Sequence, residues 1–373
     1  TYSLAGIGKT ITGTLSVSSF SVAGTYTNNA ALTCSTVLRG AGTFAQGTTG
    51  ALNIGATAAN FSVTTFNAAA SGNIVNYNLA GAQSIRVPSD GSYHHLVLGG
   101  SGNKTLLALT DINGNLTINS VLVANNFSMT LAGNWLNTGT FTPGNGTVTL
   151  DGAAQSITKA GGEIFNHLTV SGTGIKTLAS AITTSGNLIV NSTLDVSASN
   201  FGVTVQGNWT NNGTFTQQSG TVTFNGAAAQ TIGGTATTNF NNITQDNSFG
   251  VSLTHDQNLI DALTISVGTF TTTGFNFTMI SDASKTARIA AILSGANFAG
   301  NIIMQRYTGT GPTDWRFLSS AVSGASISDW ADDFATSGFT GSTQPGLSFV
   351  SIYSYNEAVA GIADNGYVAA TNV

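Results

Sequence analysis

One stretch of the sequence occurs twice, and this duplication constrains the fold more than any other feature. Residues 133–150 read GNWLNTGTFTPGNGTVTL and residues 207–224 read GNWTNNGTFTQQSGTVTF, with twelve of the eighteen positions identical at an offset of 74 residues. HLVLGGSGNKTL at 95–106 likewise returns as HLTVSGTGIKTL at 167–178. Self-similarity at a fixed period is typical of architectures in which similar units stack along an axis. The sequence therefore predicts a repeat protein.

The composition fits a β-structured repeat protein with few surface charges. Only 7% of the 373 residues are charged, against roughly 25% in an average soluble domain. Hydrophobic residues make up 41%, so the chain lacks the low hydrophobicity and high charge of a disordered segment. We expect outward faces that carry hydroxyl and amide groups instead of charged groups.

Charge and cysteine content exclude several classes of partner and cross-link. The net charge is −5 and the ten Lys and Arg residues are scattered singly, which argues against nucleic acid because phosphate binding needs a basic stripe. No apolar run reaches the ~20 residues that a membrane-spanning helix needs. Cys34 is the sole cysteine, so no intrachain disulfide can form and stability must come from stacking.

Hydrophobic residues alternate with polar ones in short runs that end at Gly or Asn. Val148 and Leu150 alternate with two threonines, which is the period of a half-buried strand. Gly and Asn favour the positive φ values of corners between strands. Eight or nine strands fit into one 74-residue unit, and three strands per coil then give about 25 residues per coil. The sequence predicts an all-β fold with a right-handed parallel β-helix (β-solenoid) over residues 1–281, roughly 55 Å long.

Equivalent positions of the two copies are predicted to stack inside this solenoid. The offset of 74 residues is even, so each side chain should keep its face of the strand. We therefore expect the side chains to be buried, each member of the second copy lying above its counterpart. The expected pairs are Trp135 with Trp209, Phe141 with Phe215, and Val148 with Val222.

The composition changes after the repeats. Residues 282–307 contain two expected strands, 288–293 and 301–307, that would cap the solenoid, because an open edge invites pairing with other chains. Residues 308–373 hold short aromatic strands and polar loops, which predict part of a β-sandwich. A sandwich usually needs about 100 residues, so we expect its missing strands to come from chain beyond Val373 or from a neighbouring subunit.

The repeats and the segment after them resemble a known family. The repeats follow the pattern GNWxNNGTFTxxxGTVTFNGxxxQTI, and they are followed by TARIAAI (286–292), NIIMQRY (301–307), WRFLSSAVSG (315–324) and SIYSYNE (351–357). These words are similar to those of large secreted surface proteins of the Bacteroidetes. The resemblance implies an extracellular or cell-surface, adhesin-like protein exported by the type IX route. The C-terminal sorting segment of such proteins and their Asp-Ser or Asp-Thr glycosylation dipeptides do not occur in this sequence.

Residues that could take part in catalysis fall singly. A polysaccharide-cleaving β-helix needs clustered carboxylates with a basic residue or a cation on one sheet. His94 and His95 are adjacent, so in a strand they would face opposite ways and could not chelate one ion. We predict no enzymatic activity. Four single acids at Gly-rich corners are interpreted as turn formers: Asp111, Asp151, Asp195 and Glu163.

Two acidic groups are candidate cation sites. The denser one lies beside Trp330 and would be a Ca²⁺ site that stabilises the C-terminal domain, with a solvated loop as the alternative. A second would form if acids of the last repeat gathered on one side of the coils. No other cofactor is predicted. The first group is Asp329, Asp332 and Asp333, and the second is Asp246, Asp256 and Asp261.

Thr-x-Thr pairs recur in the manner of β-solenoids that bind ice. The pairs come twice per three expected coils, so a ladder built from them would be interrupted, and the pattern disfavours ice binding. The pairs begin at Thr140, Thr147, Thr214, Thr221 and Thr269.

Two functions of different classes remain open. We expect a structural role as a rigid β-helical stalk or filament segment on a bacterial surface, with neighbouring subunits, cell-surface groups or glycans as partners. Stacked coils pair through the backbone and end in edges to which further chains can add. The alternative is a carbohydrate-binding or polysaccharide-cleaving module that uses aromatic residues such as Trp330, Tyr353 and Tyr355.

Overall fold

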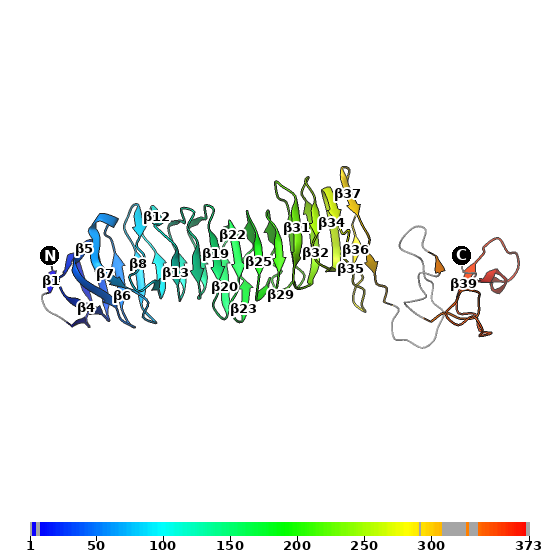
Figure 1. Cartoon of the computed structure of the whole chain (residues 1–373), viewed down its shortest axis with the longest axis horizontal. Helices are drawn as coiled ribbons and strands as arrows, with labels where there is room; N and C mark the ends of the chain where they lie inside the picture. Colours follow the sequence, from blue (N-terminus) through cyan, green and yellow to red (C-terminus); the bar gives the residue numbers. More distant parts are fainter. Residues whose placement is uncertain (1, 5–7, 291, 308–325, 328–334, 371–373) are drawn as a thin grey trace. The chain divides into compact units, whose positions relative to one another are not determined.

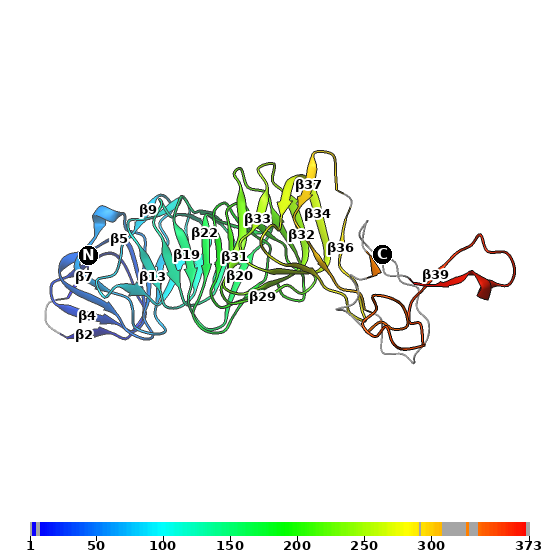
Figure 2. The same cartoon turned by 45° about the vertical axis from the view of Figure 1, so that its right-hand side comes forward.

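The described residues of the computed structural model are 2–4, 8–290, 292–307, 326–327 and 335–370. They belong to two compact units, Thr1–Thr308 and Gly309–Val373. The first unit is a β-solenoid whose coils stack in parallel (Figure 1), with about 20 residues in each turn and about 14 turns. The turned view shows the same stack from another side (Figure 2). The predicted all-β solenoid is confirmed.

Each coil of the solenoid has three short strands, one on each of three faces. The chain runs over the first, second and third face and returns to the first face one coil further on. The first face contains β6 (Ala51–Ile54), β8 (Ile74–Tyr77), β11 (His95–Leu98), β14 (Leu116–Ile118), β17 (Trp135–Asn137), β20 (Gln155–Lys159), β23 (Ile175–Leu178), β26 (Thr193–Asp195) and β29 (Thr214–Thr216).

The strands of the other two faces alternate with these along the chain. The second face contains β9 (Gln83–Ile85), β12 (Asn103–Leu106), β15 (Val121–Val123), β18 (Thr140–Thr142), β21 (Glu163–Phe165), β24 (Ile182–Thr184), β27 (Val203–Val205) and β30 (Thr221–Phe224). The third face contains β10 (Ser92–Tyr93), β13 (Thr110–Ile112), β16 (Met129–Leu131), β19 (Thr147–Leu150), β22 (His167–Val170), β25 (Leu188–Val190), β28 (Trp209–Asn211), β31 (Gln230–Gly234) and β33 (Val251–Leu253).

Longer strands form the coils near the two ends of the unit. At the N-terminal end they are β1 (Tyr2–Leu4), β2 (Lys9–Ile11), β3 (Leu15–Val22), β4 (Thr25–Asn28), β5 (Ala31–Gln46) and β7 (Phe61–Asn67), with the short 3₁₀ helix Ala58–Asn60 before β7. At the other end they are β32 (Thr238–Asp246) and β34 (Gln257–Thr271), followed by the short strands β35 (Phe277–Met279), β36 (Arg288–Ile289), β37 (Ala296–Ala299) and β38 (Ile303–Met304). β34 bends across all three faces, because β35, β36 and β37 pair with successive parts of it.

Glycine allows the sharp corners between these strands. Gly172 and Gly174 turn the chain between β22 and β23 with φ values of 70° and 76°, which side chains other than Gly and Asn rarely adopt. A Cβ atom on Gly172 would also lie 1.9 Å from the carbonyl oxygen of Asp151 in the preceding coil. The corner residue is therefore fixed both by backbone conformation and by close approach of the next coil.

The coil is shorter than the sequence analysis predicted. The chain passes eleven strands between β17 and β28, which begin with the equivalent Trp135 and Trp209, whereas eight or nine were expected. Most of these strands have only three or four residues, and the corners between them are tight. With three strands in each coil, one 74-residue repeat covers three and two-thirds coils. The prediction of about 25 residues per coil is therefore wrong, and the value is about 20.

The expected stacking of equivalent residues is also wrong, although all six side chains are buried. Eleven strands are not a whole number of coils, so the second copy of the repeat is rotated by one third of a turn. Trp135 lies on the first face and Trp209 on the third, and each is stacked on a leucine of the coil before it. The same rotation separates Phe141 from Phe215 and Val148 from Val222, whose direct neighbours in the preceding coils are Leu122, Leu194, Met129 and Val203.

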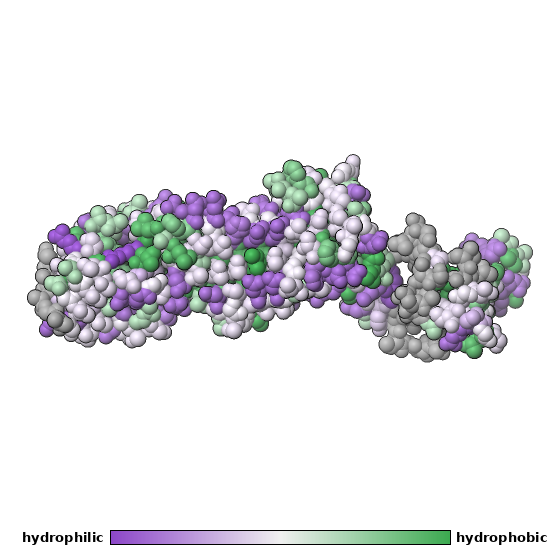
Figure 3. Space-filling view, in the orientation of Figure 1, coloured by the Kyte–Doolittle hydropathy of each residue, from purple (hydrophilic) through white to green (hydrophobic). Residues whose placement is uncertain are grey.

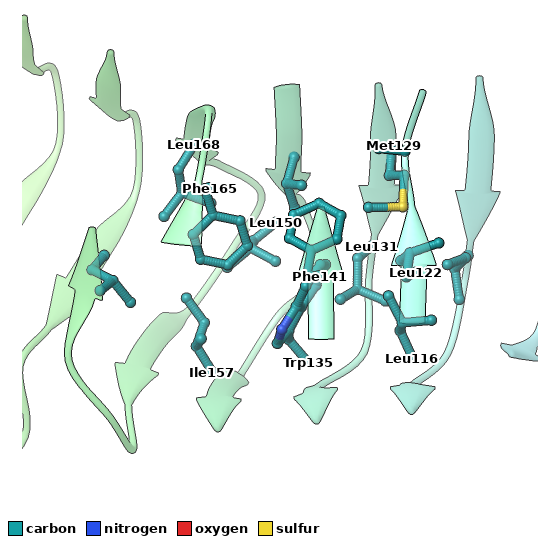
Figure 4. Packing of buried hydrophobic residues seen from close by; sticks show 14 of the residues in the cluster. Leu116, Leu122, Met129, Leu131, Trp135, Phe141, Leu150, Ile157, Phe165 and Leu168 are labelled. Atoms are coloured by element: carbon teal, nitrogen blue, oxygen red, sulfur yellow. The ribbon is translucent and has the colours of Figure 1, made fainter. Parts of the chain in front are cut away.

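Aromatic triads fill the core at equivalent places in the two repeats. Trp135 packs its ring 4.9 Å from Phe141 and 5.1 Å from Phe165, centroid to centroid (Figure 4). In the second repeat Trp209 lies 4.9 Å from Phe215 and 5.3 Å from Phe240. Both arrangements are edge-on or tilted, as the charge distribution of aromatic rings favours. The local surroundings of each side chain are thus repeated although the face is not.

The second unit contains a smaller sheet. β39 (Tyr353–Tyr355) and β40 (Tyr367–Ala369) form an antiparallel pair, joined by a connection that includes the 3₁₀ helix Ala363–Gly366. This pair is the one sheet among the described residues of the unit. The β-sandwich over residues 308–373 stays a prediction.

Candidate functional site

The predicted cation sites receive no support from the described residues. Asp329, Asp332, Asp333 and the neighbouring Trp330 lie outside them. In the part of the chain that is described, no three His, Cys, Asp or Glu residues come together in an arrangement that could hold a metal ion. The second expected group does not form, because its acids bond elsewhere. Asp261 forms an ion pair with Arg288, and Asp256 accepts a hydrogen bond from the backbone N–H of Asn276 at 2.8 Å.

Glu163 does not sit at an exposed corner, as the sequence analysis expected, but is buried in β21. One oxygen of its carboxyl group accepts hydrogen bonds from Trp135 Nε1 and Asn137 Nδ2, both at 2.7 Å. The other oxygen accepts the backbone N–H of Ile164 at 3.1 Å. Burial raises the pKa of Glu163, and these donors oppose the increase only in part. The alternation in this strand places Glu163 on the inner side, a placement that the sequence pattern of a three-residue strand is too short to reveal.

Two lysines are fully buried inside the solenoid, a placement that sequence reasoning missed. Lys104 Nζ donates to the carbonyl oxygens of Leu79, Gly81 and Ser101, each at 2.8 Å. Lys176 stands at the equivalent repeat position and donates to three carbonyl oxygens at 2.6–3.2 Å, those of Gly152, Ala153 and Thr173. Burial lowers the pKa of both lysines. The signal in the sequence was the lysine shared by GNKTL and GIKTL.

A buried glutamine recurs in all three repeats and lies directly against these lysines. Gln155 Nε2 donates to the carbonyl oxygens of Leu131 and Gly133 in the preceding coil, at 2.7 and 2.6 Å, while its Oε1 accepts the N–H of Gly152. Gln83 and Gln230 make the same three kinds of bond. Each glutamine therefore satisfies backbone groups that a coil corner leaves unpaired.

Histidine and asparagine side chains form a second kind of link between coils. His95 Nδ1 accepts the backbone N–H of Asn115 at 2.9 Å, and Asn115 Oδ1 in turn accepts the N–H of Asn134 at 2.8 Å. His167 and Asn187 begin an equivalent ladder in the next repeat, with distances of 2.9 and 2.9 Å. An accepting Nδ1 carries no proton, so the imidazole of His95 is neutral in this arrangement. Burial and the neighbouring His94 lower the pKa of His95.

The prediction that His94 and His95 face opposite ways is wrong. Their ring centroids lie 4.2 Å apart at an interplanar angle of 90°. His94 falls between β10 and β11 and not inside a strand, so the alternation of strand side chains does not apply to it. The site nevertheless offers no third ligand of the kind that a metal needs, within the residues that are described.

The buried polar groups support the fold more readily than chemistry. Glu163 bonds to two side chains and one backbone N–H, and the lysines and glutamines bond to backbone carbonyls of their own or the preceding coil. None of these bonds joins a nucleophile to a base, which is the arrangement that covalent catalysis requires. What the groups do is hold one coil to the next.

An exposed tyrosine cluster in the second unit is the best candidate for a ligand-binding surface. Tyr355 and Tyr367 face each other across the β39–β40 pair with ring centroids 5.1 Å apart, and Tyr353 lies 6.3 Å from Tyr367. Their exposed fractions are 39% for Tyr353, 49% for Tyr355 and 46% for Tyr367. The sequence analysis named the first two and missed Tyr367, although the word DNGY contained it.

Comparisons with known protein families, with curated proteins and with solved structures find no match to this chain. Among the described residues, no helix has both the length and the apolar character needed to cross a bilayer.

Proposed function

We propose that the protein is a structural segment of a stalk or filament at a cell surface or in the extracellular space. The observation that carries the proposal is the recurrence of the buried glutamine at 83, 155 and 230, which ties each corner to the preceding coil. A rod built in this way is stabilised by contacts between neighbouring coils, as in other repeat architectures. The rod would be about 65 Å long, given about 14 coils at about 4.8 Å each.

The extracellular location and the adhesive or assembly role rest on the sequence. The repeat words and the words that follow them resemble secreted surface proteins, and the low content of charge leaves broad surfaces without ionic groups. We propose further that the protein catalyses no reaction, because the buried polar groups of the solenoid are engaged with backbone groups of adjoining coils.

Immunogold electron microscopy of intact cells with an antibody against the solenoid tests the location and the assembly together. We expect gold particles on the outer surface, arranged along fibres or stalks. Label confined to the cell interior would overturn the proposal. Incubation of the purified protein with a panel of polysaccharides should release no new reducing ends, and release that a single Asp or Glu substitution abolishes would show it to be an enzyme.

A second candidate function, carbohydrate binding, is favoured by the exposed tyrosine cluster. Aromatic rings with one apolar face and a polar hydroxyl suit the flat faces and hydroxyl groups of sugars. Glycan-array binding by the full chain is expected to fall in a Tyr355→Ala/Tyr367→Ala variant. Tyr307→Ala, which removes a tyrosine of 48% exposure in the first unit, is the matched control. Equal binding by all three proteins would exclude the cluster.

A further inference from the structure

The second face of the solenoid differs from the other two in having an outer surface without charge. From β12 to the middle parts of β32 (242–245) and β34 (262–265), the outward residues are Thr, Val, Ile, Asn and Ala only. The first face carries His95, Lys159 and Asp195, and the third carries Asp111 and His167. The charged residues Asp246 and Arg288 lie at the margin of the second face.

Five threonines form an unbroken column along this face. Thr183, Thr204, Thr223, Thr244 and Thr264 occupy consecutive coils, and each pairs in register with the next. The sequence analysis expected an interrupted ladder because it counted Thr-x-Thr pairs within the repeats. The rotation of the repeat by one third of a turn instead brings threonines of different repeat positions into one column. Within the described part of the chain, no hydrogen bond joins these hydroxyl groups to another protein group.

Side chains in such a column are both rigid and regularly spaced. Thr, Val and Ile are branched at Cβ, so they lose little freedom when a second surface packs against them. The coil spacing of about 4.7–4.9 Å is set by backbone hydrogen bonds between parallel strands. A partner that fits along the whole face must have the same spacing, and a second solenoid of this chain has it by construction. Face-to-face packing of two such sheets is the arrangement by which β-strand stacks bury small side chains.

We infer that the second face is the surface through which two copies of this chain associate side by side. The inference deepens the proposed structural role, on which it rests, by assigning the lateral contact to one face. Nine coils at about 4.8 Å, each about 12 Å wide, give a footprint of about 500 Å² per copy and about 1,000 Å² for the pair. That total reaches the lower limit for a specific interface. The absence of charge removes the desolvation cost that an ionic face would impose.

Apolar residues strengthen one end of this face. Val121 and Val123 lie on it, and Ile164 is 52% exposed in the fourth of the nine coils. Leu107 and Leu109, with exposed fractions of 52% and 60%, connect β12 to β13 at its edge. Figure 3 shows hydrophobic surface over this part of the solenoid. Exposed apolar side chains that lie together commonly mark an interaction surface.

Charge substitution at the centre of the face tests the inference. In sedimentation velocity over a range of concentrations, we expect the wild-type chain to associate and a Thr183→Arg/Thr223→Arg variant to associate at least about tenfold more weakly, since like charges would meet across the contact. The matched control is Thr117→Arg/Thr158→Arg, which places two arginines two coils apart on the first face. Circular dichroism melts establish that each variant is folded, and Thr183→Val/Thr223→Val should still associate.

Each outcome decides the inference. If the control variant weakens association as much as the test variant does, or if only the control does, the face is wrong while self-assembly stands. A wild-type chain that stays monomeric at the highest soluble concentration overturns the lateral contact, and surface labelling of cells then decides the structural role separately. If the test variant loses binding to an insoluble polysaccharide with unchanged sedimentation, the partner is a glycan and the inference fails.

A cross-linking experiment gives a second readout that does not depend on affinity. Thr183 lies in the middle coil of the nine, so a two-fold axis through the centre of the face brings it close to its own copy. Thr183→Cys should form a disulfide-linked dimer under mild oxidation, whereas Thr158→Cys on the first face should not. Cys34 is buried, so it does not compete. Equal dimer yields from the two variants would contradict the inference.

Discussion

The two copies of the repeat in residues 133–165 and 207–240 share their sequence and their local packing but not their place on the molecule. In both copies a tryptophan packs 4.9 Å from a phenylalanine two strand positions after it in the coil's interior. In the first copy that tryptophan lies on the first face, and in the second on the third. The difference teaches that the repeat encodes the contacts of each strand with its neighbours, whereas the number of strands per repeat sets the face.

The partner of the tryptophan N–H group also differs between the copies. Trp135 Nε1 donates to the carboxyl group of Glu163 at 2.7 Å, and Trp209 Nε1 donates to the hydroxyl group of Thr238 at 3.2 Å. An asparagine two residues after each tryptophan, Asn137 or Asn211, donates to the same acceptor. A charged and an uncharged acceptor thus occupy one structural position.

The third repeat departs further from the first two. Val251 takes the position of Lys104 and Lys176, as its pairing with Gln230 shows. Asn247 then supplies a donor, bonding to the carbonyl oxygen of Ala228 at 2.7 Å. An amide has replaced the ammonium group as the donor at this corner.

The largest expected effect comes from removing an aromatic ring of each triad. Phe141→Ala and Phe215→Ala should each destabilise their coils by about 3–5 kcal/mol, because both rings are buried and leave a cavity. Their exposed fractions are 8% and 6%. Native-state hydrogen exchange of the affected coils is the measurement, since long repeat arrays need not unfold in one step.

Equal costs in the two copies would support local contacts as the determinant of stability. A cost confined to one copy would show instead that the face matters. Phe249→Ala is the control, because that ring is 65% exposed and its loss should change the stability by no more than about 0.5 kcal/mol.

Exchanging the buried lysine and valine should have a smaller effect. Lys176→Met removes the donor to three backbone carbonyls and is expected to cost about 2–3 kcal/mol, the scale of bonds to charged groups after relief of lysine desolvation. Val251→Lys should also destabilise, because Asn247 already occupies a carbonyl there. Urea denaturation measures both, with Lys9→Met as the exposed control. A stabilising Lys176→Met would contradict this view.

The smallest expected effect is a difference in pH dependence between Glu163 and Thr238. Burial raises the folded-state pKa of Glu163 above its unfolded value, so the folded state holds a proton that the unfolded state releases. The contribution is fully present below the unfolded pKa and is lost as the pH rises through the folded pKa, by at most about 1.4 kcal/mol per pH unit.

Urea midpoints measured from acidic to neutral pH test this difference. Glu163→Gln should remove that part of the pH dependence, and Thr238→Glu should introduce a similar one in the second copy. Identical pH profiles for the wild type and Glu163→Gln would show that the carboxyl group does not titrate between the folded and unfolded states.

The sequence by itself determined the solenoid and its core. Alternation in runs such as 147–150, glycines at corners and the 74-residue offset predicted stacked parallel strands, and the six predicted core residues are buried. These features are local, because strand period and turn chemistry depend on neighbouring residues alone.

Only the tertiary structure decided which residues meet. Strands of three residues are too short for alternation to separate inward Glu163 from an exposed corner, and two lysines became core residues because three carbonyls converge on each Nζ atom. The threonine column of the second face could not be found from Thr-x-Thr pairs. Its members are joined by the number of strands in a repeat, and eleven strands on three faces rotate each copy by a third of a turn.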